Sequence, residues 1–247
     1  MPTRPFAYPD FHAASSTEGR YMESENWTSV AHWPRAWLEI VFKTYPRMPL
    51  VPLPEVPWES RLSLSEALLR RSSERANTPE PLALDTLSVL LREATRIKPT
   101  DVDPGSRRVY PSAGARFPVE LYVAVNRCAE LDSGLYHYRP LDHALEQLDT
   151  GPQRDRLLRV FGHDWIADAR CVVLLSAELS RSAVKYGDRA YRFSLIEAGH
   201  LMHNLLLVGT DLETAVTPVG GFADDRVHRY LALGPTEEYV LYTAVVS

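Results

Sequence analysis

The segment from Tyr191 to Val208 constrains the fold of this chain more than any other stretch. Its apolar residues recur at helical spacing, and in its second half they lie almost all round the helix axis. Such a helix must be covered, because exposure of apolar surface to water is unfavourable. We therefore expect a long central helix that lies in a core or in a subunit interface.

Further segments predict a sheet beside that helix. Val119–Asn126 alternates and is rich in β-branched residues, and Cys171–Ser176 is a short apolar run that suits a buried strand. The other predicted strands are Leu135–Tyr138, Ala144–Leu148 and Val240–Val246. Because helices and strands are mixed along the chain, the pattern is typical of an α+β fold.

Shorter helices are predicted around this core. Glu66 lies three residues after Ser63, as in a capping box, which marks the start of a helix. The predicted helices run from Ser63 or Ser65 to Arg71, from Leu84 to Ile97, and from about Asp224.

Residues 1–60 are predicted to form an N-terminal arm and residues 61–247 the main domain. Five prolines between Tyr45 and Trp58 suit neither a regular helix nor a central strand, so this stretch should be extended. Only Trp37–Lys43 suggests a short helix. The arm is rich in aromatic residues but unable to form its own core, so we expect it to lie over another surface, such as a second subunit.

Composition excludes several classes of function. A net charge of −5 without a dense basic run argues against a nucleic-acid partner. Cys128 and Cys171 have no CxxC spacing, which favours neither a disulfide framework nor a zinc site. No apolar stretch reaches the roughly 18 to 20 residues of a membrane span, and no signal core is present at the N-terminus. We expect a cytoplasmic protein without a membrane partner.

Three acidic or imidazole side chains on the long helix resemble metal ligands at first sight. Glu197, His200 and His203 follow one another at steps of three residues, which turns Glu197 and His203 about 120° apart around the helix. No HExxH motif accompanies them, so we expect no metal site. The chain also lacks GxSxG, GxGxxG and GxxxxGK[ST].

The tripeptide Lys185-Tyr186-Gly187 lies between a strand that ends near Glu178 and the helix that starts near Arg189. A lysine ammonium beside a phenol lowers the phenol's pKa from about 10, because the positive charge favours the phenolate. Such a tyrosine is able to accept a proton from carbon, which makes the pair a catalytic candidate. An isolated Lys-Tyr dipeptide is otherwise typical of a solvated surface.

Three further segments suit an anion and a flat ring. Arg70–Arg75 offers three guanidinium groups and two hydroxyls, which fit a phosphate, although such a cluster is also typical of a solvated helix end. Tyr110–Arg116 is a small-residue loop whose backbone can approach a ligand, or a simple tight turn. Pro218–Phe222 precedes a helix and can present backbone N–H groups.

The motifs occur in the order RRSSER, YPSAGARFPVE, GLYHY, KYGDRAYRF and PVGGF. In this order they closely resemble the SagB-type dehydrogenases of the nitroreductase-like flavoproteins, which include the oxidases of thiazole and oxazole biosynthesis. The resemblance extends from about Leu53, or from as early as Phe11, to the C-terminus. It implies an α+β nitroreductase-like fold, with a central, mainly antiparallel sheet flanked by helices and FMN at a homodimer interface.

The resemblance also implies roles for individual residues. The implied catalytic pair is Lys185 and Tyr186, and the implied cofactor-binding residues are Arg71, Ser73, Arg75, Ser112, Ala113, Gly114, Asn204, Val219, Gly220 and Gly221. The register of the arginine motif stays open, because either Ser72 or Glu74 replaces one of the family's arginines.

The function that this resemblance implies is the oxidation of a thiazoline or oxazoline ring in a peptide or a carrier-bound intermediate. FMN would accept a hydride from Cβ while Tyr186, assisted by Lys185, takes the proton from Cα. A cyclodehydratase complex is a further expected partner. Two alternatives stay open, an NAD(P)H-dependent nitro or quinone reductase and a non-catalytic scaffold subunit of a cyclodehydratase complex.

Overall fold

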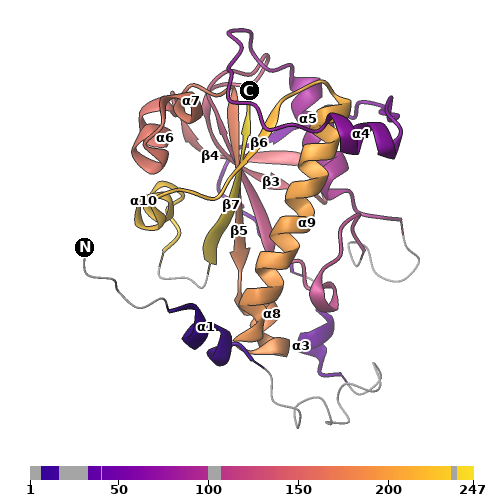
Figure 1. Cartoon of the computed structure of the whole chain (residues 1–247), viewed down its shortest axis with the longest axis vertical. Coiled ribbons are helices and arrows are strands. Elements are labelled where there is room, and N and C mark those ends of the chain that lie inside the picture. The colour runs from indigo at the N-terminus through magenta and orange to yellow at the C-terminus, as the bar shows by residue number, and fades with distance from the viewer. Residues whose placement is uncertain (1–6, 17–32, 40, 100–106, 235–237) are drawn as a thin grey trace.

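An antiparallel sheet runs through the centre of the protein (Figure 1). The computed structural model describes residues 7–16, 33–39, 41–99, 107–234 and 238–247. Within these residues the sheet has seven strands in the order β1-β4-β3-β2-β5-β7-β6, and every neighbouring pair is antiparallel. The strands are β1 (Leu50–Pro52), β2 (Val119–Val125), β3 (Gly134–Arg139), β4 (Ala144–Thr150), β5 (Cys171–Glu178), β6 (Val216–Val219) and β7 (Glu238–Val246).

Helices cover both faces of this sheet. The helices are α1 (Tyr8–Ala14), α3 (Arg35–Leu38), α4 (Leu64–Arg70), α5 (Leu84–Thr95), α6 (Arg154–Phe161), α7 (Asp164–Ala167), α8 (Ser180–Tyr186), α9 (Arg189–Asp211) and α10 (Asp224–Tyr230). Alternate residues of β2 face different cores: Leu121 and Val123 pack with α5 and α9, whereas Tyr122 and Ala124 pack with α6, α7 and α10. The predicted α+β architecture, with an antiparallel sheet flanked by helices, is confirmed.

The central helix α9 is longer than predicted and only partly covered. Leu201 and Leu205 are fully buried against the sheet, and the backbone at Gly209 approaches β6 so closely that a Cβ there would lie 2.4 Å from a Val216 methyl carbon. On the opposite side Leu195 and Ile196 are 41% and 55% exposed. One face of α9 therefore lies in a core as expected, and the other is open in the single chain.

The predicted capping box at the start of α4 is confirmed. The Ser63 hydroxyl accepts a hydrogen bond from the Glu66 backbone N–H (3.3 Å), and a carboxylate oxygen of Glu66 accepts one from the Ser63 N–H (2.9 Å). The two bonds satisfy backbone donors that the helix itself leaves unpaired.

The N-terminal arm differs from the prediction in one element. The predicted helix Trp37–Lys43 is wrong: α3 begins at Arg35 and ends at Leu38, and residues 41–45 form no helix. Tertiary contacts hold these residues, because the Lys43 ammonium pairs with Glu238 and the Tyr45 N–H donates to Glu146 (2.7 Å). The proline-rich stretch supplies β1, an edge strand that pairs only with β4. The division of the chain at residue 60 stays a prediction.

The first helix of the arm lies against the start of α9. Phe11 contacts the Tyr191 ring edge-on at 5.3 Å between centroids, and Arg192 Nε donates to the Ser15 hydroxyl (2.6 Å). The arm was expected to lie over another surface, and its helix α1 lies over α9 of the same chain.

Among the described residues, no helix combines the length and apolar character that crossing a bilayer requires.

Candidate functional site

Lys185 and Tyr186 form the last turn of α8, which follows β5 directly. Gly187 ends the helix with a positive φ of 53°, and its N–H donates to the Ala183 carbonyl (2.8 Å). A buried ion pair holds α8 to the sheet, since Arg181 Nη1 lies 2.6 Å from a carboxylate oxygen of Glu120 in β2. The pair is therefore placed by a helix that is itself fixed to the central sheet.

The small-residue loop before β2 lies against this pair. Gly114 has a φ of +60°, and a Cβ on it would lie 2.5 Å from the Tyr186 hydroxyl oxygen and 3.2 Å from Lys185 Nζ. Ala115 and Phe117 in the same loop also have positive φ, at 52° and 46°, a conformation that costs non-glycine residues energy and is concentrated at functional sites. The absence of a side chain at Gly114 is what permits the contact.

Strand pairing explains why residues so far apart in sequence meet. β2 and β5 are antiparallel, with Val119 opposite Ala177. The loop that precedes β2 and the helix that follows β5 therefore emerge at the same end of the sheet. The sequence prediction that these two motifs belong to one site agrees with this placement, and what each binds stays a prediction.

Two cations lie close to the phenol. Lys185 is 2% exposed, and burial, with a contribution from the nearby Arg116, lowers the pKa of its ammonium. Burial likewise lowers the pKa of Arg116, while the charge of Tyr186 opposes that shift. Arg116 Nε donates to the Arg181 carbonyl and Nη1 to the Trp37 carbonyl, both at 2.8 Å. Sequence reasoning gave Arg116 no role, although its place at the end of the YPSAGAR loop was a usable signal.

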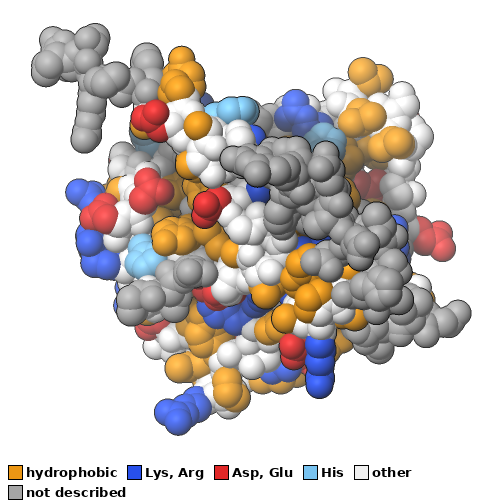
Figure 2. All heavy atoms as spheres, turned by 90° about the horizontal axis from the view of Figure 1, so that it is seen from below, with side chains coloured by type: hydrophobic (Ala, Val, Ile, Leu, Met, Phe, Trp, Pro, Cys, Tyr) orange, Lys and Arg blue, Asp and Glu red, His pale blue; other side chains and the backbone are white. Residues whose placement is uncertain are grey.

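Aromatic side chains of the arm cover the lysine. Lys185 Nζ lies 3.2 Å from the centroid of the Trp33 ring and 5.3 Å from that of Trp37. The Trp37 indole N–H donates to the Val184 carbonyl (3.0 Å). Figure 2 views this end of the molecule, and the exposed hydrophobic side chains around it include Tyr8, Phe11, Leu38 and Val184.

Glu197 is a buried carboxyl that faces the same loop from α9. Burial raises its pKa to about 7, against the opposing effect of hydrogen bonds from Ser112 and the Val119 N–H. One of its carboxylate oxygens has no hydrogen-bond partner within the described residues.

The two histidines that follow Glu197 along the helix, His200 and His203, are exposed, so Glu197 does not share a face with them. The structure gathers no group of three His, Cys, Asp or Glu suited to a metal ion within the ranges it describes.

The predicted phosphate-binding residues lie at the other end of α9. α4 ends at Arg70, and Arg71, Ser73 and Arg75 follow in an open segment, with the Arg75 guanidinium 5.6 Å from the centroid of the Trp165 ring. A hollow of about 480 Å³ lies beside this segment and is lined by residues that include Arg70, Ser72, Glu74, Arg170 and Thr210.

Strand β6, which leads into the predicted glycine residues Gly220 and Gly221, begins beside this arginine segment. The Thr217 hydroxyl of β6 contacts the Glu74 carbonyl. Pro218 and Val219 are strand residues of β6, an element that was not predicted from the sequence, and the Val219 carbonyl accepts a hydrogen bond from the Thr243 hydroxyl (2.7 Å). The strand forms because β7 supplies a partner that local sequence does not reveal. Gly220 and Gly221, which follow β6, are exposed, and their role in binding a cofactor stays a prediction.

Asn204 lies apart from both groups. Its side-chain amide donates to the Ala94 carbonyl at the end of α5 (3.1 Å). In this structure the residue therefore joins α9 to α5.

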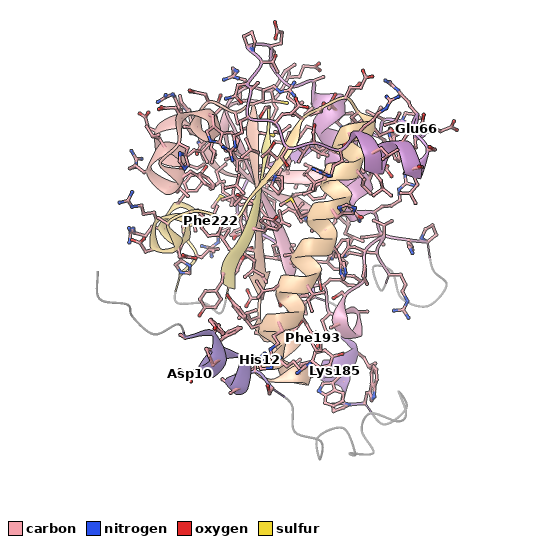
Figure 3. The ribbon with its side chains drawn as sticks, viewed as in Figure 1. Asp10, His12, Glu66, Lys185, Phe193 and Phe222 are labelled. Carbon is pink, nitrogen blue, oxygen red and sulfur yellow. The ribbon has the colours of Figure 1, made fainter. Side chains whose placement is uncertain are left out.

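One chain does not bring the two groups of predicted residues together. Figure 3 shows Lys185 at one end of α9 and Glu66 of α4 at the other. α9 has 23 residues, which corresponds to a length of about 34 Å at about 1.5 Å per residue. A single mononucleotide is shorter than this span.

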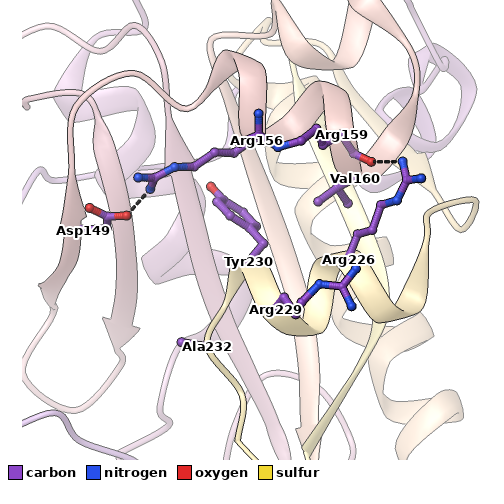
Figure 4. A pocket seen from close by; sticks show the side chains of 8 residues that line it. All are labelled: Asp149, Arg156, Arg159, Val160, Arg226, Arg229, Tyr230 and Ala232. Carbon is purple, nitrogen blue, oxygen red and sulfur yellow. Dashed lines mark hydrogen bonds and ion pairs between the residues drawn. The ribbon is translucent and has the colours of Figure 1, made fainter.

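A second hollow, lined by four arginines, lies away from both ends of α9. Figure 4 shows this space of about 500 Å³ between α6 and α10. Arg156 pairs with Asp149, Arg229 pairs with Asp225, and Arg226 donates to the Arg159 carbonyl (2.9 Å). The Arg156–Asp149 pair joins α6 to β4 and the Arg226 contact joins α10 to α6, whereas the Arg229–Asp225 pair lies within α10. None of the predicted site residues lines the hollow.

Comparison with known proteins gives a consistent result. The profile of the Nitroreductase family matches residues 68–246. A Methanocaldococcus jannaschii protein that carries a nitroreductase name, MJ1384, is 31% identical over 188 residues, which cover 76% of this chain and 91% of that protein. The microcin B17-processing protein McbC of Escherichia coli is 29% identical over 170 residues, 62% of this chain and 57% of McbC. The chain thus spans little more than half the length of McbC.

Solved structures share the fold. A chain of the E. coli microcin synthetase McbBCD complex with truncated pro-MccB17 bound superposes with a TM-score of 0.61 at 23% identity, covering 97% of this chain and 91% of that one. A structure from Exiguobacterium sibiricum in complex with FMN has a TM-score of 0.54 at 13% identity, covering 76% of this chain and 89% of that one. Both comparisons show that these proteins and this chain have the same fold.

Proposed function

The chain belongs to the nitroreductase family, and from that premise we propose that it is an FMN-dependent dehydrogenase that oxidises thiazoline or oxazoline rings to thiazole or oxazole. The observation that carries the proposal is the contact of the Gly114 backbone with Lys185 and Tyr186. It places a phenol, which two buried cations accompany, against the backbone of the small-residue loop. Relatedness to McbC, a protein named for microcin B17 processing, supports a peptide as the substrate.

The residues present fit FMN in two places. At the arginine end, Arg71 and Arg75 offer forked donors and Ser73 offers a hydroxyl, which suit a phosphate. At the other end, the small residues Ala113 and Gly114 leave the loop backbone open to a flat ring. Proteins of this family typically bind FMN.

Because these two places lie at opposite ends of α9, we propose that the site is completed by a second copy of the chain. Exposed apolar side chains support this, since Leu64, Leu68 and Leu69 of α4 are 68%, 49% and 83% exposed and Leu195 and Ile196 of α9 are 41% and 55% exposed. A homodimer would place the arginine segment of one chain near the Lys185 end of its partner.

In the proposed reaction, the azoline ring loses a proton from Cα and a hydride from Cβ, and it becomes aromatic. FMN, when bound, supplies the hydride acceptor. Tyr186 takes the proton at its phenolic oxygen, and the ammonium of Lys185 and the guanidinium of Arg116 stabilise the charge that this oxygen carries. Lys185 is buried and Tyr186 is half-buried, which limits the access of water and strengthens these interactions.

The proposal is tested on the purified protein with an azoline-containing peptide. We expect a flavin absorption spectrum and a peptide product lighter by two hydrogens. Rapid bleaching of the flavin by NADPH with no change in the peptide would instead indicate a nitro or quinone reductase. A colourless protein that does not take up added FMN would indicate a scaffold subunit.

A further inference from the structure

Trp33 and Trp37 contact Lys185 in different ways. Trp37 is anchored at two points, because its indole N–H donates to Val184 and its carbonyl accepts from Arg116. The Trp33 indole N–H is buried without a hydrogen-bond partner within the described parts of the chain. Trp33 lies on Lys185 and meets the Trp37 ring edge-on, with 6.1 Å between centroids. Trp37 is thus fixed to the site, whereas Trp33 rests on it through its ring face.

Trp33 lies over Lys185 and blocks the access of a substrate to it as long as the indole stays in place. Lys185 is 2% exposed, so a substrate ring has no access to its ammonium while Trp33 lies on it. The group that lies there is a flat aromatic ring, and a thiazoline or oxazoline ring is also flat and small. The ammonium that binds the indole face is also able to donate to the ring nitrogen of an azoline, and the thiazole or oxazole that forms presents an aromatic face of its own.

We propose that Trp33 and Trp37 line the substrate site, Trp37 as a fixed wall and Trp33 as a movable ring that occupies the place of the substrate's heterocycle until the substrate displaces it. This rests on the proposed role of Lys185 and Tyr186. The arm then sets which substrates enter: a flat five-membered ring replaces an indole, whereas a bulky side chain next to that ring meets Trp37.

The lysine content of the chain allows a direct test of the cover. The sequence contains only Lys43, Lys98 and Lys185. Lys98 is exposed and serves as the internal reference, and Lys43 pairs with Glu238. Acetylation by acetic anhydride, read residue by residue by mass spectrometry, should label Lys98 well before Lys185. Trp33→Ala should raise the Lys185 rate about tenfold or more, which is the scale of one lost desolvated cation–π contact.

Two variants control this experiment. Trp33→Phe keeps a ring over the lysine and should retain protection, which separates loss of the cover from misfolding. Trp165→Ala removes the tryptophan that lies over Arg75 at the other end of the molecule and should leave Lys185 protected. Equal labelling of Lys185 and Lys98 in the unaltered protein, or continued protection in Trp33→Ala, would overturn the proposal.

Steady-state kinetics with an azoline peptide test the displacement itself. Trp33→Ala should lower KM severalfold with kcat nearly unchanged, because the competing ring is gone, and Trp37→Ala should raise KM. A rise of KM in both variants would overturn the movable role of Trp33. Absence of turnover in every protein, the unaltered one included, would overturn the proposed function and with it the substrate wall. The labelling result would still establish the cover over Lys185.

Discussion

The two ends of α9 differ in how completely a single chain assembles them. At the Lys185 end, a loop, a helix and the arm are already in contact, and both cations are buried. At the arginine end, Ser72–Ala76 are exposed. The groups proposed to carry out proton transfer are thus positioned before any ligand binds, whereas the groups proposed to hold an anion stay accessible to it. Variants at the Lys185 end should therefore lose turnover, whereas variants at the arginine end should lose affinity for FMN.

The largest expected effect is at the closed end. Lys185→Ala and Tyr186→Phe should each lower turnover by about 10²- to 10⁴-fold, the range for loss of a general base, while FMN is retained. Flavin absorbance of the purified variants and single-turnover oxidation of an azoline peptide measure both properties. Full activity in both variants would contradict the assignment of the pair.

Gly114→Ala tests the contact between the loop and the pair. The new Cβ would lie 2.5 Å from the Tyr186 oxygen, so the loop or the tyrosine must move, and a displacement of about 1 Å costs about 10²-fold in turnover. Gly162→Ala is the matched control, because Gly162 has a similar φ of +69° but no atom within 4 Å of the added Cβ. Equal kcat values for the two variants would mean that the contact has no part in turnover.

Glu197 should make the free energy of unfolding depend on pH. Its pKa is raised to about 7 from the ordinary value of 4.5, so the folded state holds a proton more tightly than the unfolded state. The resulting stability is fully present below pH 4.5 and is lost as pH rises through 7, an effect of about 3 kcal/mol. Glu197→Gln should remove most of this slope, measured as the free energy of unfolding in urea at pH 5 and pH 8. A variant less stable than the unaltered protein at pH 8 would speak against this interpretation.

The smallest effects are expected at the arginine end, because Arg71 and Arg75 are proposed to bind the same phosphate and each contributes only part of the affinity. Arg71→Ala or Arg75→Ala should weaken FMN binding by about tenfold or somewhat more, as for one lost charge-assisted hydrogen bond, with kcat unchanged at saturating FMN. Fluorescence titration of the apoprotein with FMN measures this. Arg229→Ala is the control, since Arg229 is exposed and pairs with Asp225 on α10. A loss of kcat without a loss of FMN affinity would reverse the proposed division between the two ends.

Local sequence predicted the elements whose cause is local. The Ser63–Glu66 capping box and the alternation of β2 both depend on residues a few positions apart, and both were predicted. The helix expected at Trp37–Lys43 was wrong because Lys43 and Tyr45 bind groups on distant strands. Strand β6 was not predicted for a similar reason, since its partner β7 follows it only after α10.

The sequence by itself determined the motifs and the kinds of element that carry them, because capping, alternation and residue chemistry act over short distances. Only the tertiary structure decided that Gly114 lies against Tyr186, that Arg116 accompanies the pair, and that Trp33 covers Lys185. The first of these contacts follows from the register of β2 on β5, and the separation of the arginine segment from the pair follows from the length of α9. Pairing between distant segments depends on the burial of both faces of the sheet at once, which no short stretch of sequence specifies.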